Sequence, residues 1–339
     1  MNQDPDFRNP PAAPAQPLDA LIAERIRNDG PMSLAGFMRL ALYHPEHGYY
    51  RRDRRRIGAD PESDFVTAYS TGPVFADLVT AAARRLMDPT VAAGATWVEI
   101  GVDRQKPLWP EPPPPFRDVV SLGRDDPLVV PSPAAVFSNE LFDAQPFNRV
   151  RFLDGSWKET GVGLDRDGAR IEVPLPTHTS EVTALLPRLP TTAPEGAIVD
   201  LPTGAVGLLD DLAAQDWRGL ILIFDYGKSW ESLSHEFPQG TLRAYRHHRQ
   251  SPDILARPGE QDLTGHICWD WMTACLEKHG FNQIELLNQE TFFVRHAAPA
   301  IETLIGRHPG QPDPARSRLH QLIHPAHMGQ KFQVLSARR

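Results

Sequence analysis

Three apolar segments of this sequence each end in side chains suited to ligand binding or acid–base chemistry. The segment 95–101 (ATWVEIG) ends in Glu-Ile-Gly, 134–138 (AAVFS) is followed by Asn139-Glu140, and 220–224 (LILIF) is followed by Asp225. Unbroken apolar runs of this length are typical of strands buried on both faces of a sheet. In a doubly wound α/β fold, ligands bind beyond the carboxyl ends of the parallel strands. We therefore expect these polar groups to share one edge of such a sheet.

Two further places offer candidate ligand contacts. Glu99 and Gly101 close the first apolar segment, and an acidic residue with a glycine at the first turn suits a nucleotide-like cofactor. Asp64 and Thr67 precede a helix expected at 74–87. They either cap this helix or contact a ligand at its entrance, and the residues alone favour capping.

Histidine groups raise the question of a metal site. His44 and His47 have a ligand-like spacing, but no third ligand is evident. Three more histidines lie within 320–327, where Pro325 interrupts any helical face that they could share. We therefore predict no metal site.

Composition limits the class of protein. The chain has 339 residues, a formal net charge of −8 and a pI of about 5.9, which argues against a general nucleic-acid or anionic-membrane binder. The basic run 51–56 is interpreted as a solvated loop rather than a binding patch. Cys268 and Cys275 are seven positions apart in one helical pattern, about 10.5 Å, which is too far for a disulfide. With no secretory signal and no apolar run that could span a membrane, we expect a cytoplasmic protein.

Several segments together resemble the MidA-type methyltransferases, a family that includes a mitochondrial complex I assembly factor that methylates an arginine. The resemblance covers most of the chain after residue 30, in the order of the family. It rests on GPMSLAGFMRLALYHPEHGYY (30–50), SDFVTAYS (63–70), WVEIG (97–101), FSNELFDAQPF (137–147), IFDYG (223–227), GTLRAYRHH (240–248), PGEQDLTGHI (258–267) and MGQKFQVL (328–335).

The resemblance implies a class I methyltransferase fold with a Rossmann-like sheet, S-adenosyl-L-methionine as cofactor, and a protein arginine as methyl acceptor. The acceptor protein implied by analogy is a subunit of a respiratory complex. The cofactor-binding residues that it implies are Asp64, Thr67, Glu99, Gly101 and Asn139. The catalytic residues that it implies are Asn139, Glu140, Asp225 and His247. Phe65 joins the residues of an N-terminal lid, and Tyr226 and Asp262 join an acceptor-side wall.

The sequence departs from the family pattern after the first strand. The family has a Gly-x-Gly type turn there, whereas this chain has 102–105 (VDRQ), whose side chains fill the space a ligand needs. Only 37 positions (102–138) connect the two buried strands, and nine of these are prolines. We therefore expect the second strand to be missing, with no clear replacement for its ribose-binding acid at Asp103 or Asp118. Ser70 also stands where the family has a glutamate.

The domain organisation follows from these patterns. We expect a disordered leader at 1–17, a helical lid region at 18–88 and a Rossmann-like domain at 89–339. This domain would contain a proline-rich segment at 102–133 and an irregular insert at about 240–264. Within it, β-hairpin turns are expected at 154–155 and 167–168, and Thr264 is expected to cap a helix.

Two hypotheses follow. The first is a methyltransferase with an eroded cofactor site, and the second is a catalytically inactive descendant that serves as a protein-binding or assembly module. The residues alone favour the binding module slightly, because cofactor sites tolerate the loss of loops poorly. The resemblance favours the enzyme, and the predicted function is therefore protein arginine methylation. No nucleophile-elbow pattern supports a Ser/His/Asp hydrolase.

Overall fold

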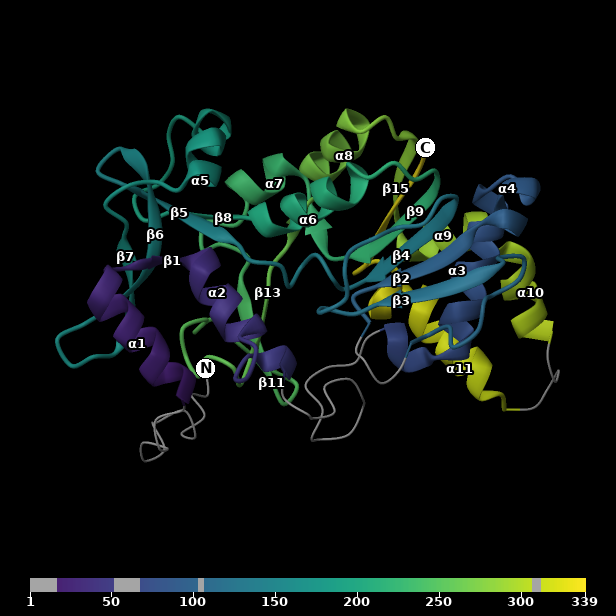
Figure 1. Ribbon diagram of the computed structural model, residues 1–339, viewed down its shortest axis with the longest axis horizontal. Helices are drawn as coiled ribbons and strands as arrows, with labels where there is room; N and C mark the ends of the chain where they lie inside the picture. The colour runs from purple at the N-terminus through teal and green to yellow at the C-terminus, as the bar shows by residue number, and fades with distance from the viewer. Residues whose placement is uncertain (1–16, 52–67, 103–106, 307–311) are drawn as a thin grey trace.

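The larger of two main sheets carries the predicted strands. The computed structural model describes residues 17–51, 68–102, 107–306 and 312–339 (Figure 1). Its six-stranded sheet has the order β15-β16-β9-β4-β2-β3, in which β3, β2, β4 and β9 are parallel and β16 is antiparallel to both neighbours. The doubly wound α/β fold is thereby confirmed. These strands are β2 (Thr96–Ile100), β3 (Asp118–Leu122), β4 (Ala134–Asn139), β9 (Gly219–Asp225), β15 (Asn282–Asn288) and β16 (Gln333–Arg338).

The expectation of a missing second strand is wrong. β3 pairs with β2 in parallel, from Thr96 opposite Asp118 to Ile100 opposite Leu122. The sequence concealed β3 because it is an edge strand whose residues are mostly exposed or half-buried, so it lacks an unbroken apolar run. Instead, the described parts of the connections on both sides of β3 contain no helix. The connections are therefore short, and the strand is present.

Helices cover both faces of this sheet (Figure 1). One cover packs on Phe137 and Phe224, and the other packs on Val136 and Ile223. The first cover consists of α3 (Pro73–Leu86), α9 (Gln289–His296), α10 (Ala298–Gly306) and α11 (Pro314–Ile323), and the second of α6 (Thr203–Ala213) and α8 (Trp269–Lys278). None of the described helices has both the length and the apolar character needed to cross a membrane.

The proline-rich segment replaces a helix as cover for β2. Trp109 and Phe116 pack on Trp97, with ring centroids 4.6 and 5.0 Å away. The Trp109 indole N–H also donates to Thr80 Oγ1 of α3 at 3.1 Å. Aromatic rings bury a large apolar area per residue, so two of them cover β2 without regular secondary structure.

The second sheet is antiparallel and has five strands. Its order is β1-β6-β5-β8, and β7 also pairs with β6, off this path. It lies beside the first sheet, at the left in Figure 1. The predicted hairpin turns are confirmed at 154–155 and 167–168. The strands are β1 (Met32–Ser33), β5 (Asn148–Leu153), β6 (Ser156–Leu164), β7 (Arg170–Pro174) and β8 (Ile198–Leu201).

The N-terminal helices belong to this second unit. α1 (Pro17–Asp29) and α2 (Leu34–Tyr43) share an apolar cluster with Val162 of β6. Ser33 caps α2 by accepting the Gly36 N–H at 3.1 Å. The region expected to form one lid at 18–88 is therefore divided, because α3 packs on the larger sheet.

The remaining short helical elements are α4 (Pro89–Gly94), α5 (Ser180–Leu185), α7 (Trp230–His235), η2 (Tyr49–Arg51), η3 (Ala68–Thr71), η4 (Leu186–Arg188) and η5 (Pro325–Gly329).

The insert at 240–264 is more regular than expected. It forms a three-stranded sheet in the order β12-β11-β13. Thr264 ends β13 and does not cap α8, whose N-cap position is Cys268. Cys268 and Cys275 are both buried and unpaired by a disulfide, as predicted. The short strands are β10 (Gly227–Lys228), β11 (Arg243–Arg246), β12 (Arg249–Ser251), β13 (Asp262–Thr264) and β14 (Ile267–Cys268).

Candidate active site

A large cleft lies at the carboxyl edge of the larger sheet. Its volume is about 2920 Å³, and residues from all three regions of the fold line it. Gly101 and Asn139 come from the larger sheet, Asn148 from the second sheet, and Tyr245 and Asp262 from the insert. The predicted edge of the sheet therefore faces a space large enough for a nucleotide-sized ligand together with part of a second molecule.

Asn139 and Glu140 lie at the centre of this edge. Glu140 adopts a left-handed backbone conformation with φ of 49°, which is unusual for a residue other than glycine. Its N–H donates to the Phe224 carbonyl at 2.9 Å, and its carboxylate accepts the Asn139 side-chain N–H at 3.0 Å. Among the described residues, the buried Asn139 Oδ1 has no hydrogen-bond partner. A strained backbone beside an unsatisfied acceptor is typical of a functional site.

Asp225 lies behind this turn and does not line the cleft. It is fully buried, and its carboxylate accepts the backbone N–H groups of Phe142 at 2.9 Å, Asp143 at 3.3 Å and Tyr226 at 2.7 Å. Burial raises the pKa of Asp225 to about 7. These bonds fix the turn that follows β4, so its geometry gives Asp225 a positioning role.

Buried acids gather around Glu140. Glu140, Asp143 and Asp262 all line the cleft. Burial raises the pKa of Glu140 to about 8. Burial also raises the pKa of Asp143 well above its usual range, and the neighbouring Asp225 and Glu140 add to the shift. Within the described chain, the buried Asp143 Oδ1 has no hydrogen-bond partner. A bound cation would satisfy these oxygens and favour their charged form.

Two tyrosines that sequence reasoning missed connect the N-terminal region to these acids. The Tyr43 hydroxyl at the end of α2 donates to the Ala144 carbonyl at 2.9 Å. The Tyr50 hydroxyl donates to Asp262 Oδ1 at 2.9 Å. The sequence carried no sign of these contacts, because the partners of both tyrosines are more than 100 positions away.

Gly101 and the residues after β3 form the other end of the cleft. Gly101 has φ of 84°, and a Cβ there would lie 2.9 Å from Leu141 Cδ1. After β3, Asp125 pairs with the Arg51 guanidinium and Asp126 accepts the Gly123 N–H at 2.8 Å. Both aspartates line the cleft. Sequence reasoning missed these two acids because it did not detect β3. Polar residues that follow the end of a strand were the signal that identified Asn139, Glu140 and Asp225, and Asp125 and Asp126 follow β3 in the same way.

Glu99 is held by the segment after β2 and is not among the residues that line the cleft. It is fully buried, and its two carboxylate oxygens accept the Leu108 N–H at 3.2 and 3.1 Å. Burial raises its pKa to about 7. The resemblance assigns Glu99 to the cofactor, but here its carboxylate is already hydrogen-bonded to the proline-rich segment, and it does not line the cleft.

The other residues singled out in the sequence have different outcomes. His247 lies at the exposed turn between β11 and β12, with φ of 50°, and is not among the lining residues. Asp118 is exposed at the opposite end of β3, where it pairs with Arg117. Ser70 lines the cleft. Asp64, Phe65, Thr67 and Asp103 lie outside the described residues.

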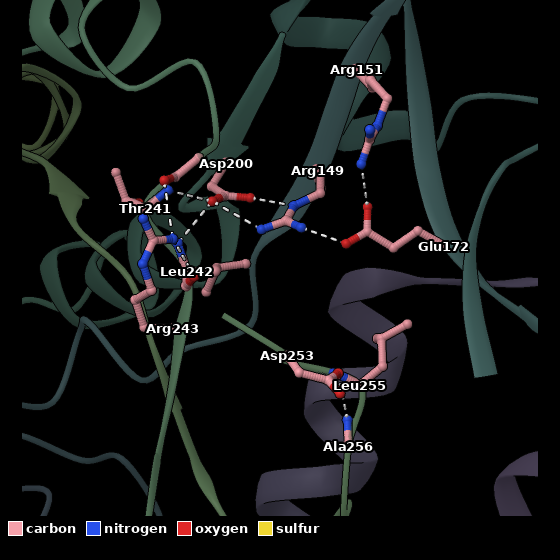
Figure 2. Close-up of polar contacts among 11 residues, drawn as sticks. Arg149, Arg151, Glu172, Asp200, Thr241, Leu242, Arg243, Asp253, Leu255 and Ala256 are labelled. Carbon is pink, nitrogen blue, oxygen red and sulfur yellow. Dashed lines mark hydrogen bonds and ion pairs between the residues drawn. The ribbon is translucent and has the colours of Figure 1, made fainter. Parts of the chain in front are cut away.

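A buried ion pair holds the loop that carries Thr241 and Arg243 beside the cleft (Figure 2). Arg149 Nε donates to Asp200 Oδ1 at 2.7 Å, and both side chains are almost completely buried. Asp200 Oδ2 accepts the N–H groups of Thr241 at 2.7 Å and Leu242 at 2.9 Å. Gly240 is required beside it, since a Cβ there would lie 2.4 Å from Asp200 Oδ2. The second sheet thus fixes the backbone from which Thr241 and Arg243 reach the cleft.

One group in the described part of the chain has the spacing of metal ligands. The ligand atoms of Asp210, Cys275 and His279 lie within 4.8 Å of one another. The Lys278 ammonium donates to Asp210 Oδ1 at 2.7 Å, and His279 lies 2.8 Å from the same oxygen. This group is therefore an ion-pair network between α6 and α8, and the predicted absence of a metal stays a prediction.

One protein-family model matches half of the chain. The model described as "Putative S-adenosyl-L-methionine-dependent methyltransferase" matches residues 117–286. The chain belongs to this family. The cofactor of the family is S-adenosyl-L-methionine, as the resemblance implied, and the MidA-type relationship is confirmed.

Two curated relatives of this chain are also named as methyltransferases. The mitochondrial protein arginine methyltransferase NDUFAF7 homologue of Drosophila melanogaster is 29% identical over 59% of this chain and 46% of its own length. The Xenopus laevis protein is 28% identical over 40% of the chain and 29% of its own length. The chain therefore spans less than half of these two relatives. The expected cytoplasmic localisation is contradicted by them, since both are named as mitochondrial proteins.

A solved methyltransferase-like structure has the same fold. A Burkholderia thailandensis protein crystallised with S-adenosylhomocysteine superimposes with a TM-score of 0.82 at 24% identity, covering 95% of this chain and 92% of that protein. A native crystal structure of a protein from the same organism gives a TM-score of 0.79 at 23% identity, covering 95% of this chain and 91% of the other. These likenesses support the fold class.

Proposed function

We propose that this protein transfers a methyl group from S-adenosyl-L-methionine to an arginine side chain of another protein. The observation that carries the proposal is a group of three acids that lines the cleft beside the carboxyl ends of β2 and β4: the half-buried Glu140 and the buried Asp143 and Asp262. A guanidinium is a planar cation whose N–H groups pair with carboxylates in a fixed geometry. The curated relatives are named protein arginine methyltransferases, which supports this acceptor.

The residues around Gly101 fit the cofactor. Gly101 has no side chain, so a ligand can approach its backbone closely. The unpartnered Asn139 Oδ1 can accept a hydrogen bond from an amino group. Asp125 and Asp126, after β3, can accept hydrogen bonds from hydroxyl groups. When bound, the cofactor supplies a methyl group activated by a sulfonium. The chain itself orients the two partners and excludes water.

Glu140 is the group suited to move a proton. An arginine nitrogen that gains a methyl group loses a proton, and the Glu140 carboxylate lines the cleft with a pKa raised to about 8. A base with a pKa near the working pH combines a useful fraction of the correct form with sufficient driving force. Asp143 and Asp262 hold the guanidinium, and Asp225 keeps the Asn139–Glu140 turn in place behind them.

Calorimetric titration with S-adenosyl-L-methionine and S-adenosylhomocysteine tests the cofactor site. We expect micromolar affinity, about −8 kcal/mol, and a loss of affinity in Gly101→Ala, because the added Cβ meets Leu141 and φ is positive. Gly94→Ala is the matched control, since nothing lies within 4 Å of its Cβ and its φ is not positive. Equal affinities in the two variants would contradict the assignment of Gly101.

Mass spectrometry tests the acceptor. Peptides that contain one arginine are expected to gain a methyl group, whereas their lysine counterparts are not. In Glu140→Gln the rate should fall by about 10²-fold or more, the lower end of what a general base contributes. Equal methylation of the lysine peptides would overturn the arginine assignment.

The engagement of Glu99 by Leu108 favours a second candidate, a catalytically inactive protein-binding module. In that case the acids of the cleft hold a partner's cationic side chain without reaction. Absence of heat at millimolar cofactor, together with binding of the arginine peptide, would support this candidate over the enzyme.

A further inference from the structure

A cationic corner lies next to the acids of the cleft. Lys228, Arg243 and His266 all line the cleft. The parallel pairing of β10 with β14 puts Lys228 opposite Cys268, two positions from His266. Between them, the Phe237 ring lies 5.7 Å from the His266 ring, edge to face, and its centroid is 6.0 Å from Lys228 Nζ. Three regions of the chain that are distant in sequence thus bring nitrogen donors together on one wall.

These nitrogens have no carboxylate of their own. No acidic side chain of the described chain lies within ion-pair distance of Lys228 or Arg243, and Arg243 Nη1 donates only to the carbonyls of Gly240 at 3.2 Å and Leu242 at 2.7 Å. His266 Nδ1 is buried and has no hydrogen-bond partner in that part of the chain. Its pKa is lowered to about 4, by burial first and then by Lys228 and Arg243. The corner is therefore a region of positive potential with an unsatisfied ring nitrogen.

The corner is fixed by the surrounding structure. Asp200 holds the backbone of Thr241 and Leu242, as Figure 2 shows. The Thr241 hydroxyl in turn accepts the backbone N–H of His266 at 3.2 Å. A binding site whose backbone is already ordered loses little conformational entropy when a ligand arrives.

The corner also adjoins the acceptor site directly. Gly265, the residue before His266, donates its N–H to the Asp143 carbonyl at 2.9 Å. Acids that suit a guanidinium and cations that suit an anion therefore occupy neighbouring positions in one cleft. A single peptide that carries both charges would complement the two positions at once.

We propose that Lys228, Arg243 and His266 form a carboxylate-binding subsite, so that the preferred acceptor presents an acidic group close to the methylated arginine. The inference rests on the proposed arginine methyltransferase function and adds the class of acceptor sequence. The carboxylate comes either from an Asp or Glu side chain or from the C-terminus of the acceptor chain.

Binding of short blocked peptides separates these sources. One peptide carries Arg with Glu two positions later, a second has Gln in place of Glu, and a third is the Gln peptide with a free C-terminal carboxylate in place of the amide. We expect the acidic peptides to bind about fivefold more tightly than the neutral one, the effect of one partly exposed ion pair. The acidic peptide that shows the larger gain identifies the source. Equal affinities of all three peptides would overturn the subsite.

Variants test the residues. In Lys228→Met the preference for the acidic peptide should be lost, whereas in Lys158→Met, an exposed lysine of β6 outside the cleft lining, it should remain. In NMR titrations the pKa of His266 should rise when the acidic peptide binds and stay constant with the neutral one, because a nearby negative charge favours the protonated ring. A preference that survives Lys228→Met, or a His266 pKa that moves equally with both peptides, would refute the inference.

These readouts distinguish failure of the subsite from failure of the proposed function. If the acidic peptide binds better but gains no methyl group, the subsite stands and the enzyme assignment fails. If both peptides are methylated with the same kcat/KM, the enzyme assignment stands and the subsite fails.

Discussion

The proposed acceptor side and the proposed cofactor side of the cleft are held by different kinds of interaction. On the acceptor side, buried polar groups fix the backbone: Asp200 with Arg149 at one loop, and Asp225 at the turn after β4. On the cofactor side, the connection between β2 and β3 has no helix in its described part, and Trp109 and Phe116 cover the sheet through aromatic contacts. Polar networks specify one geometry, whereas apolar cover tolerates changes of path. The cofactor side could therefore lose its crossover helices without loss of the sheet.

The largest effect should come from the buried ion pair. In Asp200→Asn, the Arg149 charge stays buried without its main partner, so the free energy of unfolding should fall by about 3–5 kcal/mol in urea titrations. Acceptor peptide affinity should fall with it, while cofactor affinity stays near the wild-type value. Glu172→Gln is the control, because Glu172 is partly exposed and its loss should cost about 1 kcal/mol or less. An equal loss of cofactor affinity would remove the distinction between the two sides.

The reverse pattern is expected for Trp109→Ala. Removal of a buried tryptophan costs about 3 kcal/mol or more in the free energy of unfolding, and here the loss should weaken cofactor binding and spare acceptor binding. Trp109→Phe keeps most of the ring contacts with Trp97 and loses only the hydrogen bond to Thr80, worth about 1 kcal/mol. Similar losses in both variants would mean that the hydrogen bond, not the packing, holds this segment.

Gly240→Ala sharpens the account of the acceptor side. The new Cβ would lie 2.4 Å from Asp200 Oδ2 at a φ of 66°, and we expect a loss of about 2 kcal/mol from contact and backbone strain together. Gly168→Ala has a similar positive φ with nothing within 4 Å, so its smaller loss, about 1 kcal/mol, measures the strain alone. Equal losses in both variants would show that Asp200 moves away at no cost.

A further effect depends on pH. The pKa of Glu140 is raised to about 8 in the folded protein, so the folded state binds its proton more tightly than the unfolded state does. Stability should therefore decrease as pH rises from the unfolded value of about 4.3 towards 8. Glu140→Gln should remove the contribution of Glu140 to this decrease, up to about 5 kcal/mol, because one unit of pKa shift corresponds to about 1.4 kcal/mol. Denaturation at pH 5 and pH 9 measures it, and an unchanged slope would mean that Glu140 is already charged at pH 5.

The sequence also predicts the two sides of the cleft to different extents. The strands that carry Asn139 and Asp225 were predicted because burial on both faces leaves an unbroken apolar run. β3 was missed because one edge of it has no neighbour. The contacts of Tyr50 with Asp262 and of Glu99 with Leu108 join segments whose sequences carry no sign of each other, so only the folded chain reveals them.

The loop beside Asp200 has a consequence for how specificity can change. Its shape is set by a carboxylate oxygen that binds two backbone N–H groups, and by a glycine that leaves room for that oxygen. Arg243 Nη1 also donates to the Gly240 and Leu242 carbonyls of this loop, whereas Lys228 on β10 takes no part in these bonds of its backbone. Lys228 is therefore the residue of the cationic corner that does not hold the loop. Exchange of this residue therefore alters the charge offered to an incoming chain without altering the path of the loop, so the protein can acquire new acceptors by single substitutions on an unchanged frame.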